Sequence, residues 1–107
     1  MSPEPYKVTL RDVAVEDFEV LDTSVQKQAL KQFEKLKRSP QLGKELGHKM
    51  GVDLTGYRVL RFYKGKYRIV YRILEEQKEV EIWGIGAREA GKIYRMVGER
   101  LEKHSGC

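Results

Sequence analysis

A run of basic side chains between residues 54 and 74 is the part of this chain best suited to act on a ligand. The segment LTGYRVLRFYKGKYRIVYRIL contains no Asp or Glu. Guanidinium and ammonium groups bind phosphate oxygens, arginine through two parallel hydrogen bonds, so this run favours a phosphate-containing partner. Its basic residues are Arg58, Arg61, Lys64, Lys66, Arg68 and Arg72.

The same segment has the pattern of a β-hairpin. β-Branched and aromatic residues separate the basic ones and favour strands. Tyr63-Lys64-Gly65 lies between the two runs, where a glycine at positive φ can close a short loop. Alternation in the second strand puts Arg68 and Arg72 on one face and Tyr67 and Tyr71 on the other. One face can therefore pack while the other presents cations.

Composition limits the classes of protein to consider. With 107 residues and a formal net charge of +5, we expect one domain, residues 1–107, with a small core and phosphate-rich or acidic partners. The single cysteine, Cys107, forms no internal disulfide and suits a reducing compartment. No apolar run reaches the roughly 18 residues of a membrane span, so we expect a cytoplasmic protein.

Motifs for metal and nucleotide chemistry are missing from the sequence. It contains no CxxC, HExxH, Walker A or GxGxxG pattern, and His48 and His104 have no partner at metal-ligand spacing. We therefore expect neither a metal nor a cofactor.

Around the hairpin, hydrophobic periodicity predicts further elements. They are a strand at 6–10, helices at 12–21 and 25–38, a strand at 79–85 and a helix at 88–103. The second helix has an apolar stripe that includes Leu30, and lysines on its other face are either solvated or part of an RNA-facing surface. Four glycines between residues 41 and 56 favour a loop with at most one helical turn.

This order of elements predicts an α+β domain. A small, mainly antiparallel sheet of about four strands would carry two N-terminal helices and a C-terminal helix, packed against one of its faces. Gly84 and Gly86, near the end of the last strand, would let another backbone or a ligand approach closely. Trp83 is expected in the core rather than stacked on RNA.

Three features of the sequence resemble the RelE/ParE superfamily of bacterial toxins. They are the order of the elements, the strand YRIVYRI, and the segment GAREAGKIY, in which Tyr94 follows Arg88 by six residues. The likeness covers nearly the whole chain and is closer to the RelE-type, ribosome-dependent mRNA endoribonucleases. It implies the toxin of a toxin–antitoxin pair, which cleaves mRNA in the ribosomal A site without a metal. The implied partners are a cognate antitoxin protein, the ribosome and mRNA.

In the activity that this resemblance implies, the ribose 2′-OH attacks the adjacent phosphate, and the enzyme stabilises charge and moves protons. Arg68, on a central strand, would grip the phosphate. Arg88, near a strand end and a helix N-terminus, would stabilise the developing charge or the leaving group. Tyr94 would orient or deprotonate the 2′-OH, or stack on a base. The further basic residues expected to bind substrate are Lys64, Lys66 and Arg72.

The first strand of the hairpin departs from the RelE-type pattern, in which two lysines lie two residues apart. Arg58 or Arg61 takes their place, depending on the end from which the hairpin is counted. Three residues apart on a regular strand means opposite faces, so only one of these two candidate catalytic arginines can face the substrate. Arginine stabilises charge but does not readily act as a base.

Structural roles compete with these catalytic roles. Arg68 and Arg72 could lie on a solvated sheet face without a catalytic role. Tyr94 could belong to the core or to a partner interface, and Arg88 could pair with Glu89 or Glu99. For the whole protein, one alternative is a ParE-like toxin that inhibits DNA gyrase by binding, without cutting RNA. Another is a basic nucleic-acid-binding module or an inactive toxin.

Overall fold

The predicted hairpin and the strand after it form the centre of a sheet. The computed structural model describes residues 5–49 and 51–105, so Cys107 lies outside the described part. β5 (Tyr57–Phe62), β6 (Tyr67–Leu74) and β7 (Glu79–Ala87) are antiparallel neighbours. Their alternating side chains point to the two faces of the sheet in turn.

Two short strands complete the sheet at its edges. β1 (Lys7–Leu10) lies parallel to β7, and β2 (Lys44–Glu45) lies antiparallel to β5. The order across the five-stranded sheet is β1-β7-β6-β5-β2. The predicted α+β class with a mainly antiparallel sheet is therefore confirmed, with a short additional strand at one edge.

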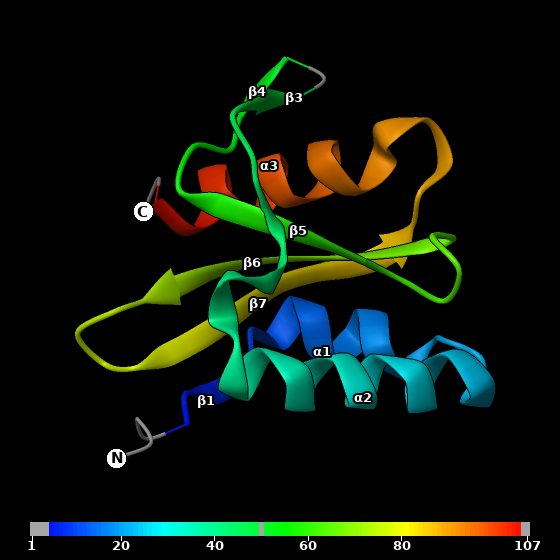
Figure 1. The fold of residues 1–107 in the computed structure, drawn as a ribbon. Helices are drawn as coiled ribbons and strands as arrows, with labels where there is room; N and C mark the ends of the chain where they lie inside the picture. Colours follow the sequence, from blue (N-terminus) through cyan, green and yellow to red (C-terminus); the bar gives the residue numbers. More distant parts are fainter. Residues whose placement is uncertain (1–4, 50, 106–107) are drawn as a thin grey trace.

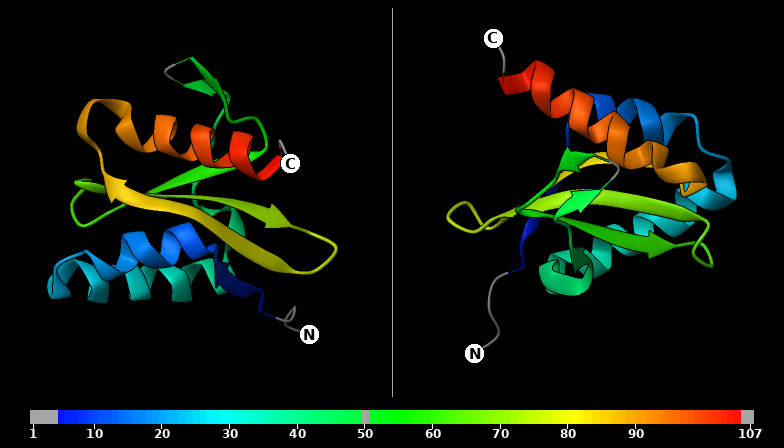
Figure 2. Two further views of the ribbon diagram at one scale, coloured as in Figure 1. Left: turned by 180° about the vertical axis from the view of Figure 1, so that it is seen from behind. Right: turned by 90° about the horizontal axis from the view of Figure 1, so that it is seen from above.

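Three helices cover the sheet, and they lie on both of its faces. α1 (Asp12–Glu19) and α2 (Thr23–Arg38) lie below the sheet in Figure 1, whereas α3 (Lys92–Ser105) lies above it. Figure 2 shows the same two layers from behind. The prediction that all helices pack against one face was wrong, because side chains on the second face, such as Val70 and Trp83, also need an apolar cover.

Each face of the sheet has its own core. The core under α1 and α2 includes Phe33, Leu36, Ile69, Tyr71 and Ile82. The core under α3 includes Val59, Val70, Trp83, Ile93 and Val97, so the prediction of a core tryptophan is confirmed. Leu30, predicted to belong to the buried stripe of α2, is 51% exposed. It was misplaced because one residue turns a helix by about 100°, which carries it to the side of the stripe.

A β-bulge decides which side chains of β7 face each helix layer. Val70 pairs with Gly84 and Tyr71 pairs with Ile82, so the intervening Trp83 has no partner in register. The extra residue lets Ile82 and Ile85, three residues apart, both join the core under α1 and α2.

Gly84 lies directly under α3. An ideal Cβ at this position would lie 2.8 Å from Val97 Cγ2 and 3.3 Å from Ile93 Cδ1. Any other residue would therefore push the helix away from β7. A close approach does occur at Gly84, but the approaching atoms are side chains of α3 and not the backbone or ligand that the sequence suggested. A Cβ at Gly86 would have only an ordinary contact with Ile93, at 3.4 Å.

The turn between β5 and β6 holds three successive residues at positive φ. Gly65 has a φ of 80°, as predicted, and Tyr63 and Lys64 have φ values of 54° and 57°. The Gly65 amide donates to the Phe62 carbonyl at 3.1 Å, as in a type I′ turn. Such a turn matches the twist of the strands, so β5 and β6 stay paired up to the basic loop.

The segment between α2 and β5 is more structured than the predicted loop. It contains a 3₁₀ turn, η1 (Pro40–Leu42), followed by β2 and by a small separate hairpin of β3 (His48–Lys49) and β4 (Val52–Asp53). The four glycines of this segment lie between these short elements, so they interrupt regular structure without preventing it.

Glu81, a buried carboxylate, organises the part of the sheet away from the β5–β6 turn. It accepts hydrogen bonds of 2.7 Å from Arg72 Nε and from Trp83 Nε1, and Arg11 Nη1 lies 3.5 Å away. Burial opposes its ionisation, but these hydrogen bonds and the charges of Arg72 and Arg11 outweigh that cost. The pKa of Glu81 consequently lies below its ordinary value of 4.5.

We expect Glu81→Gln to lower the free energy of unfolding at pH 7 by about 1–3 kcal/mol, because two arginines lose their carboxylate. Since the folded pKa lies below the unfolded one, this stabilisation is present above pH 4.5 and is lost as the pH falls through the folded value. Urea unfolding of both proteins at pH 7 and at acid pH measures the difference. An equal difference at the two pH values would contradict this role for Glu81.

Candidate functional site

The hairpin end of the sheet brings Arg68 and Tyr94 into contact. Arg68 Nε donates a hydrogen bond of 3.2 Å to Tyr94 Oη, and Arg68 Nη1 donates one of 3.4 Å to the Gly65 carbonyl. Arg68 belongs to β6, whereas Tyr94 belongs to the first turn of α3. Both side chains are partly exposed. Two residues that the sequence singled out thus meet at a surface that solvent can reach.

Arg61 and Arg88 lie at the same end of the sheet. Arg61, on β5, is the Cα partner of Arg68, so the two side chains share the face of the sheet that α3 covers. Arg88 follows the last residue of β7, and its amide donates to the Lys66 carbonyl at 3.0 Å. Both arginines are exposed, and neither pairs with a carboxylate among the described residues.

The chain around Arg88 differs from the prediction of a helix that starts there. A 3₁₀ turn, η2 (Glu89–Gly91), comes first, and α3 begins only at Lys92. Arg88 therefore lacks the adjacent α-helix N-terminus that the sequence suggested. Its alternative role, a salt bridge to Glu89 or Glu99, is not formed in the described part of the chain either.

The groups at this end of the sheet could bind and polarise a phosphate. We call them the hairpin-end groups: Arg61, Lys64, Lys66, Arg68, Arg88 and Tyr94. A guanidinium has five N–H donors, and Arg68 uses two of them within the protein, which leaves the others for a ligand. Exposed positive charge surrounds it, because the two lysines of the turn, Lys64 and Lys66, add to Arg61 and Arg88. The hydroxyl of Tyr94 accepts from Arg68 and can still donate or accept one more hydrogen bond.

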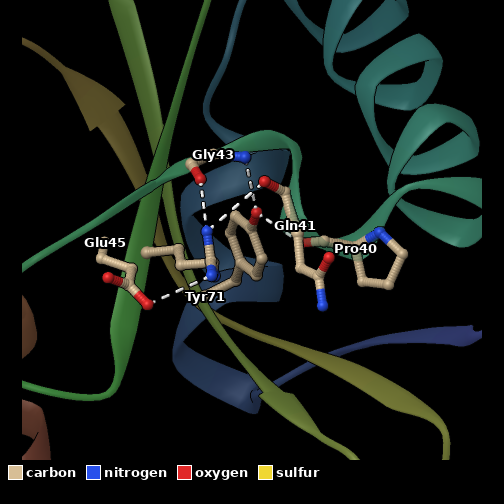
Figure 3. Close-up of polar contacts among 6 residues, drawn as sticks. Pro40, Gln41, Gly43, Glu45 and Tyr71 are labelled. Carbon is tan, nitrogen blue, oxygen red and sulfur yellow. Dashed lines mark hydrogen bonds and ion pairs between the residues drawn. The ribbon is translucent and has the colours of Figure 1, made fainter.

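Arg58 lies on the other face of the sheet. Its Cα partner is Tyr71, which is buried in the core under α1 and α2. Arg58 Nη1 donates a hydrogen bond of 2.7 Å to the Gly43 carbonyl, and Nη2 lies 3.3 Å from Glu45 Oε1 (Figure 3). Arg58 thus fixes the segment that precedes β5. Of the two candidate arginines, only Arg61 lies on the same face of the sheet as Arg68.

Arg72, expected to bind substrate, belongs to the Glu81 cluster. Its guanidinium pairs with Glu81 and lies 5.8 Å from the ring centroids of both Tyr57 and Trp83. Four residues of extended strand, about 13 Å, separate it from Arg68. The geometry therefore gives Arg72 a structural partner and keeps it apart from the hairpin-end groups.

Sequence reasoning missed one ion pair that links α1 to α3. Arg100 of α3 contacts Asp17 of α1 through two hydrogen bonds, of 2.7 and 2.9 Å. The two residues are 83 positions apart and lie in no motif, so no local pattern could have paired them.

A cavity of about 720 Å³ lies elsewhere, between β1, the start of α1 and the later part of α3. Its lining includes Arg11, Glu81, Trp83 and Arg100. None of the hairpin-end arginines, lysines or Tyr94 lines it, so the cavity and the phosphate-binding groups are separate features.

Two further properties concern the described residues only. Within residues 5–49 and 51–105, no three His, Cys, Asp or Glu side chains are grouped closely enough to hold a metal ion. Each helix in that part of the chain is too short or too polar to traverse a lipid bilayer.

Comparison with known proteins first defines the class to which this fold and site belong. The family model of the ParE toxin of the type II toxin–antitoxin system, parDE, matches residues 8–90. This chain therefore belongs to the RelE/ParE superfamily of toxins from type II toxin–antitoxin systems.

Individual relatives place the chain near RelE within that superfamily. An Escherichia coli protein named as RelE-like toxin is 25% identical over 99 residues, which span 90% of this chain and 97% of that protein. The RelBE2 toxin–antitoxin complex of Mycobacterium tuberculosis contains a chain 30% identical, with a TM-score of 0.65, covering 79% of this chain and 93% of that one. A mutant of Escherichia coli RelE in the free state gives a TM-score of 0.71 at 21% identity, covering 91% and 98%. The protein is a toxin of the RelBE type.

The substitutions Arg58→Gln and Arg61→Gln should have different effects on stability, because Arg58 bonds the backbone whereas Arg61 is exposed. We expect Arg58→Gln to lower the free energy of unfolding by about 1–2 kcal/mol, because the Gly43 carbonyl loses a charged donor. Arg61→Gln should change it by less than about 0.5 kcal/mol, since the exposed side chain has no carboxylate partner within residues 5–49 and 51–105. Urea unfolding at pH 7 tests both, and a larger loss for Arg61→Gln would contradict the assignment of faces.

Proposed function

We propose that this toxin is a ribosome-dependent endoribonuclease that cleaves mRNA in the ribosomal A site. The observation that carries the proposal is the hydrogen bond from Arg68 to Tyr94. It joins a phosphate-binding fork and a phenol at a surface where further arginines and lysines have no acidic partner among the described residues. These are the groups that cleavage of RNA without a metal requires.

In the proposed reaction, the ribose 2′-oxygen attacks the adjacent phosphorus and the bond to the 5′-oxygen breaks. Tyr94 Oη orients the 2′-OH and acts as the base that takes its proton. Arg68 binds the non-bridging phosphate oxygens through its free N–H groups and stabilises their added charge. Arg61 adds positive charge from the neighbouring strand. Products are a 2′,3′-cyclic phosphate and a 5′-OH.

Arg88 acts on the leaving group in this scheme. Its exposed guanidinium, beside Lys66, donates hydrogen bonds to the 5′-oxygen as negative charge develops there. An arginine stays protonated, so water or a ribosomal group supplies the proton that the 5′-oxygen finally takes up.

The proposed ribosome dependence would compensate for the few acid and base groups at this site. The hairpin-end groups stabilise charge well but include no histidine or carboxylate, so Tyr94 and the two lysines, Lys64 and Lys66, are the groups among them that can exchange a proton. Bound message held in line by the ribosome would supply the remaining geometry, which is worth several orders of magnitude in rate. Ribosomal RNA would attract the net positive charge of +5, and the cytoplasm is where this encounter would occur.

The proposed protein partner is a cognate antitoxin. Solved relatives include toxin–antitoxin complexes, among them RelBE2 of Mycobacterium tuberculosis and RelBE of Escherichia coli. An antitoxin that covers the hairpin-end groups, or moves α3, would separate Arg68 from message or from Tyr94.

A second candidate function is inhibition of DNA gyrase by binding. The family model that matches residues 8–90 is that of the ParE toxin, which favours this alternative. Supercoiling by gyrase in the presence of the protein separates the two functions. Inhibited supercoiling together with intact ribosome-bound message would select the binding toxin.

The proposed active site predicts how single substitutions change mRNA cleavage. We expect Arg68→Gln to slow cleavage of ribosome-bound message by about 100- to 1,000-fold, through lost charge stabilisation. Tyr94→Phe should slow it by about 100-fold or more, through lost proton transfer. Primer extension on messages from a reconstituted translation reaction measures both rates.

Lys78→Gln is the matched control for Arg68→Gln. It also removes one positive charge, but Lys78 is exposed in the turn between β6 and β7, at the other end of the sheet. Its cleavage rate should stay within about twofold of wild type. Equal losses for both variants would reduce the effect to net charge, and intact message with the wild-type protein would end the nuclease proposal.

A further inference from the structure

The contacts of α3 with the sheet are largely apolar, because Ile93 and Val97 pack with Val70 and Trp83 in one core. The residues of β7 that lie directly under Ile93 and Val97 are Gly84 and Gly86, which have no side chains to interlock with the helix. On the outer side, Gly98 meets Val52 of β4, again through van der Waals contact alone. These apolar contacts are non-directional, so a directional contact elsewhere on the helix would add to what fixes its axial position.

A directional contact lies farther along the same helix. Arg100 Nη1 donates to Asp17 Oδ2 at 2.7 Å, and Arg100 Nη2 donates to Asp17 Oδ1 at 2.9 Å, which is a bidentate pair. Only 17% of the Arg100 side chain and 14% of the Asp17 side chain are exposed. A pair of this kind accepts little change in distance or angle, and burial shields it from water.

The same two residues also bond to the backbone of β7 where β1 has ended. The pairing of β1 stops at Leu10 and Ile82. Beyond that point, Asp17 Oδ2 accepts the Ile85 amide at 3.0 Å, and Arg100 Nη1 donates to the Trp83 carbonyl at 3.0 Å. The pair therefore ties α3 to α1 and to the same strand, β7, whose end leads to Arg88.

We propose that Arg100, with Asp17, is a positioning residue that sets the axial position of α3 and so holds Tyr94 against Arg68. Arg100 lies six residues after Tyr94, about 9 Å along a rigid helix, so an axial shift at one is transmitted to the other. The bond from Arg68 to Tyr94 is already 3.2 Å long, and a shift of well under 1 Å would break it. Neither Arg100 nor Asp17 touches the substrate, and the inference rests on the proposed nuclease function for its effect on rate.

A double-mutant cycle on cleavage separates positioning from general stabilisation. We expect Arg100→Gln to slow single-turnover cleavage at saturating ribosomes by about 10- to 100-fold, with the half-saturating ribosome concentration unchanged. In a Tyr94→Phe background the same change should cost less than about twofold, because the group that it positions is already absent. Equal losses in the two backgrounds would overturn the proposal.

The controls use the same helix and the same side chain. Lys103→Gln removes an exposed charge from α3 and should leave the rate unchanged. Arg100→Lys keeps the charge but not the bidentate fork, so it should show the same selective loss if Arg100→Gln is too unstable to assay.

Fluorine NMR gives a readout that does not need nuclease activity. In protein labelled with 3-fluorotyrosine, Tyr94→Phe identifies the Tyr94 signal among those of the six tyrosines. Arg100→Lys and Asp17→Asn should shift this signal in the direction that Arg68→Gln does, while signals from tyrosines in the other core stay in place and show that the fold is kept. A Tyr94 signal that stays in place in these variants would refute positioning, whereas a wild-type protein that cuts no RNA would refute only the nuclease proposal.

Discussion

The contact between Arg68 and Tyr94 depends on how closely α3 can lie on β7. The length of the Tyr94 side chain is fixed by its ring. The helix must therefore lie close to the sheet for the Tyr94 hydroxyl to contact the guanidinium of Arg68 on β6. Gly84 permits this, because a single methyl group there would lie 2.8 Å from Val97. The bulge opposite Val70 is what puts Gly84 and Gly86 on the α3 side of the strand. One irregularity in one strand thus determines whether the phenol and the arginine can form a site.

The arginines of the hairpin and of the end of β7 fall into two groups, those with a partner in the protein and those with exposed charge. Arg72 is paired with the buried Glu81, and Arg58 bonds the chain before β5, so these two stabilise the fold. Arg61 and Arg88 have no such partner in the described residues and leave their charge at the surface. The positive field is consequently concentrated at the end of the sheet near the β5–β6 turn, although the sequence spreads it along the whole hairpin.

Local sequence patterns predicted the features of this fold that depend on neighbouring residues, but not those that depend on residues far apart in the chain. Alternation in YRIVYRIL gave the faces of β6, and the glycine of the β5–β6 turn was placed correctly, because both depend on neighbours in the chain. The side of the sheet that α3 covers and the contact of Arg100 with Asp17 depend on residues far apart, and no periodicity records them. The choice between Arg58 and Arg61 was left open by counting alone and needed the strand register. Arg72 was expected at the site because it is an arginine on the same face of β6 as Arg68. In the structure it pairs instead with the buried carboxylate of Glu81.

Membership of the RelE/ParE superfamily and the likeness to RelE are shown by the comparisons, whereas RNA cleavage is the function that we propose from the hairpin-end groups. The most direct test is a structure of the protein on a ribosome whose A-site message carries 2′-O-methyl groups, which prevent cleavage. The account predicts that one phosphate lies within hydrogen-bonding distance of Arg68, with its neighbouring 2′-oxygen beside Tyr94 Oη. A message bound against α1 and α2, or a scissile phosphate out of reach of Arg68, would contradict it.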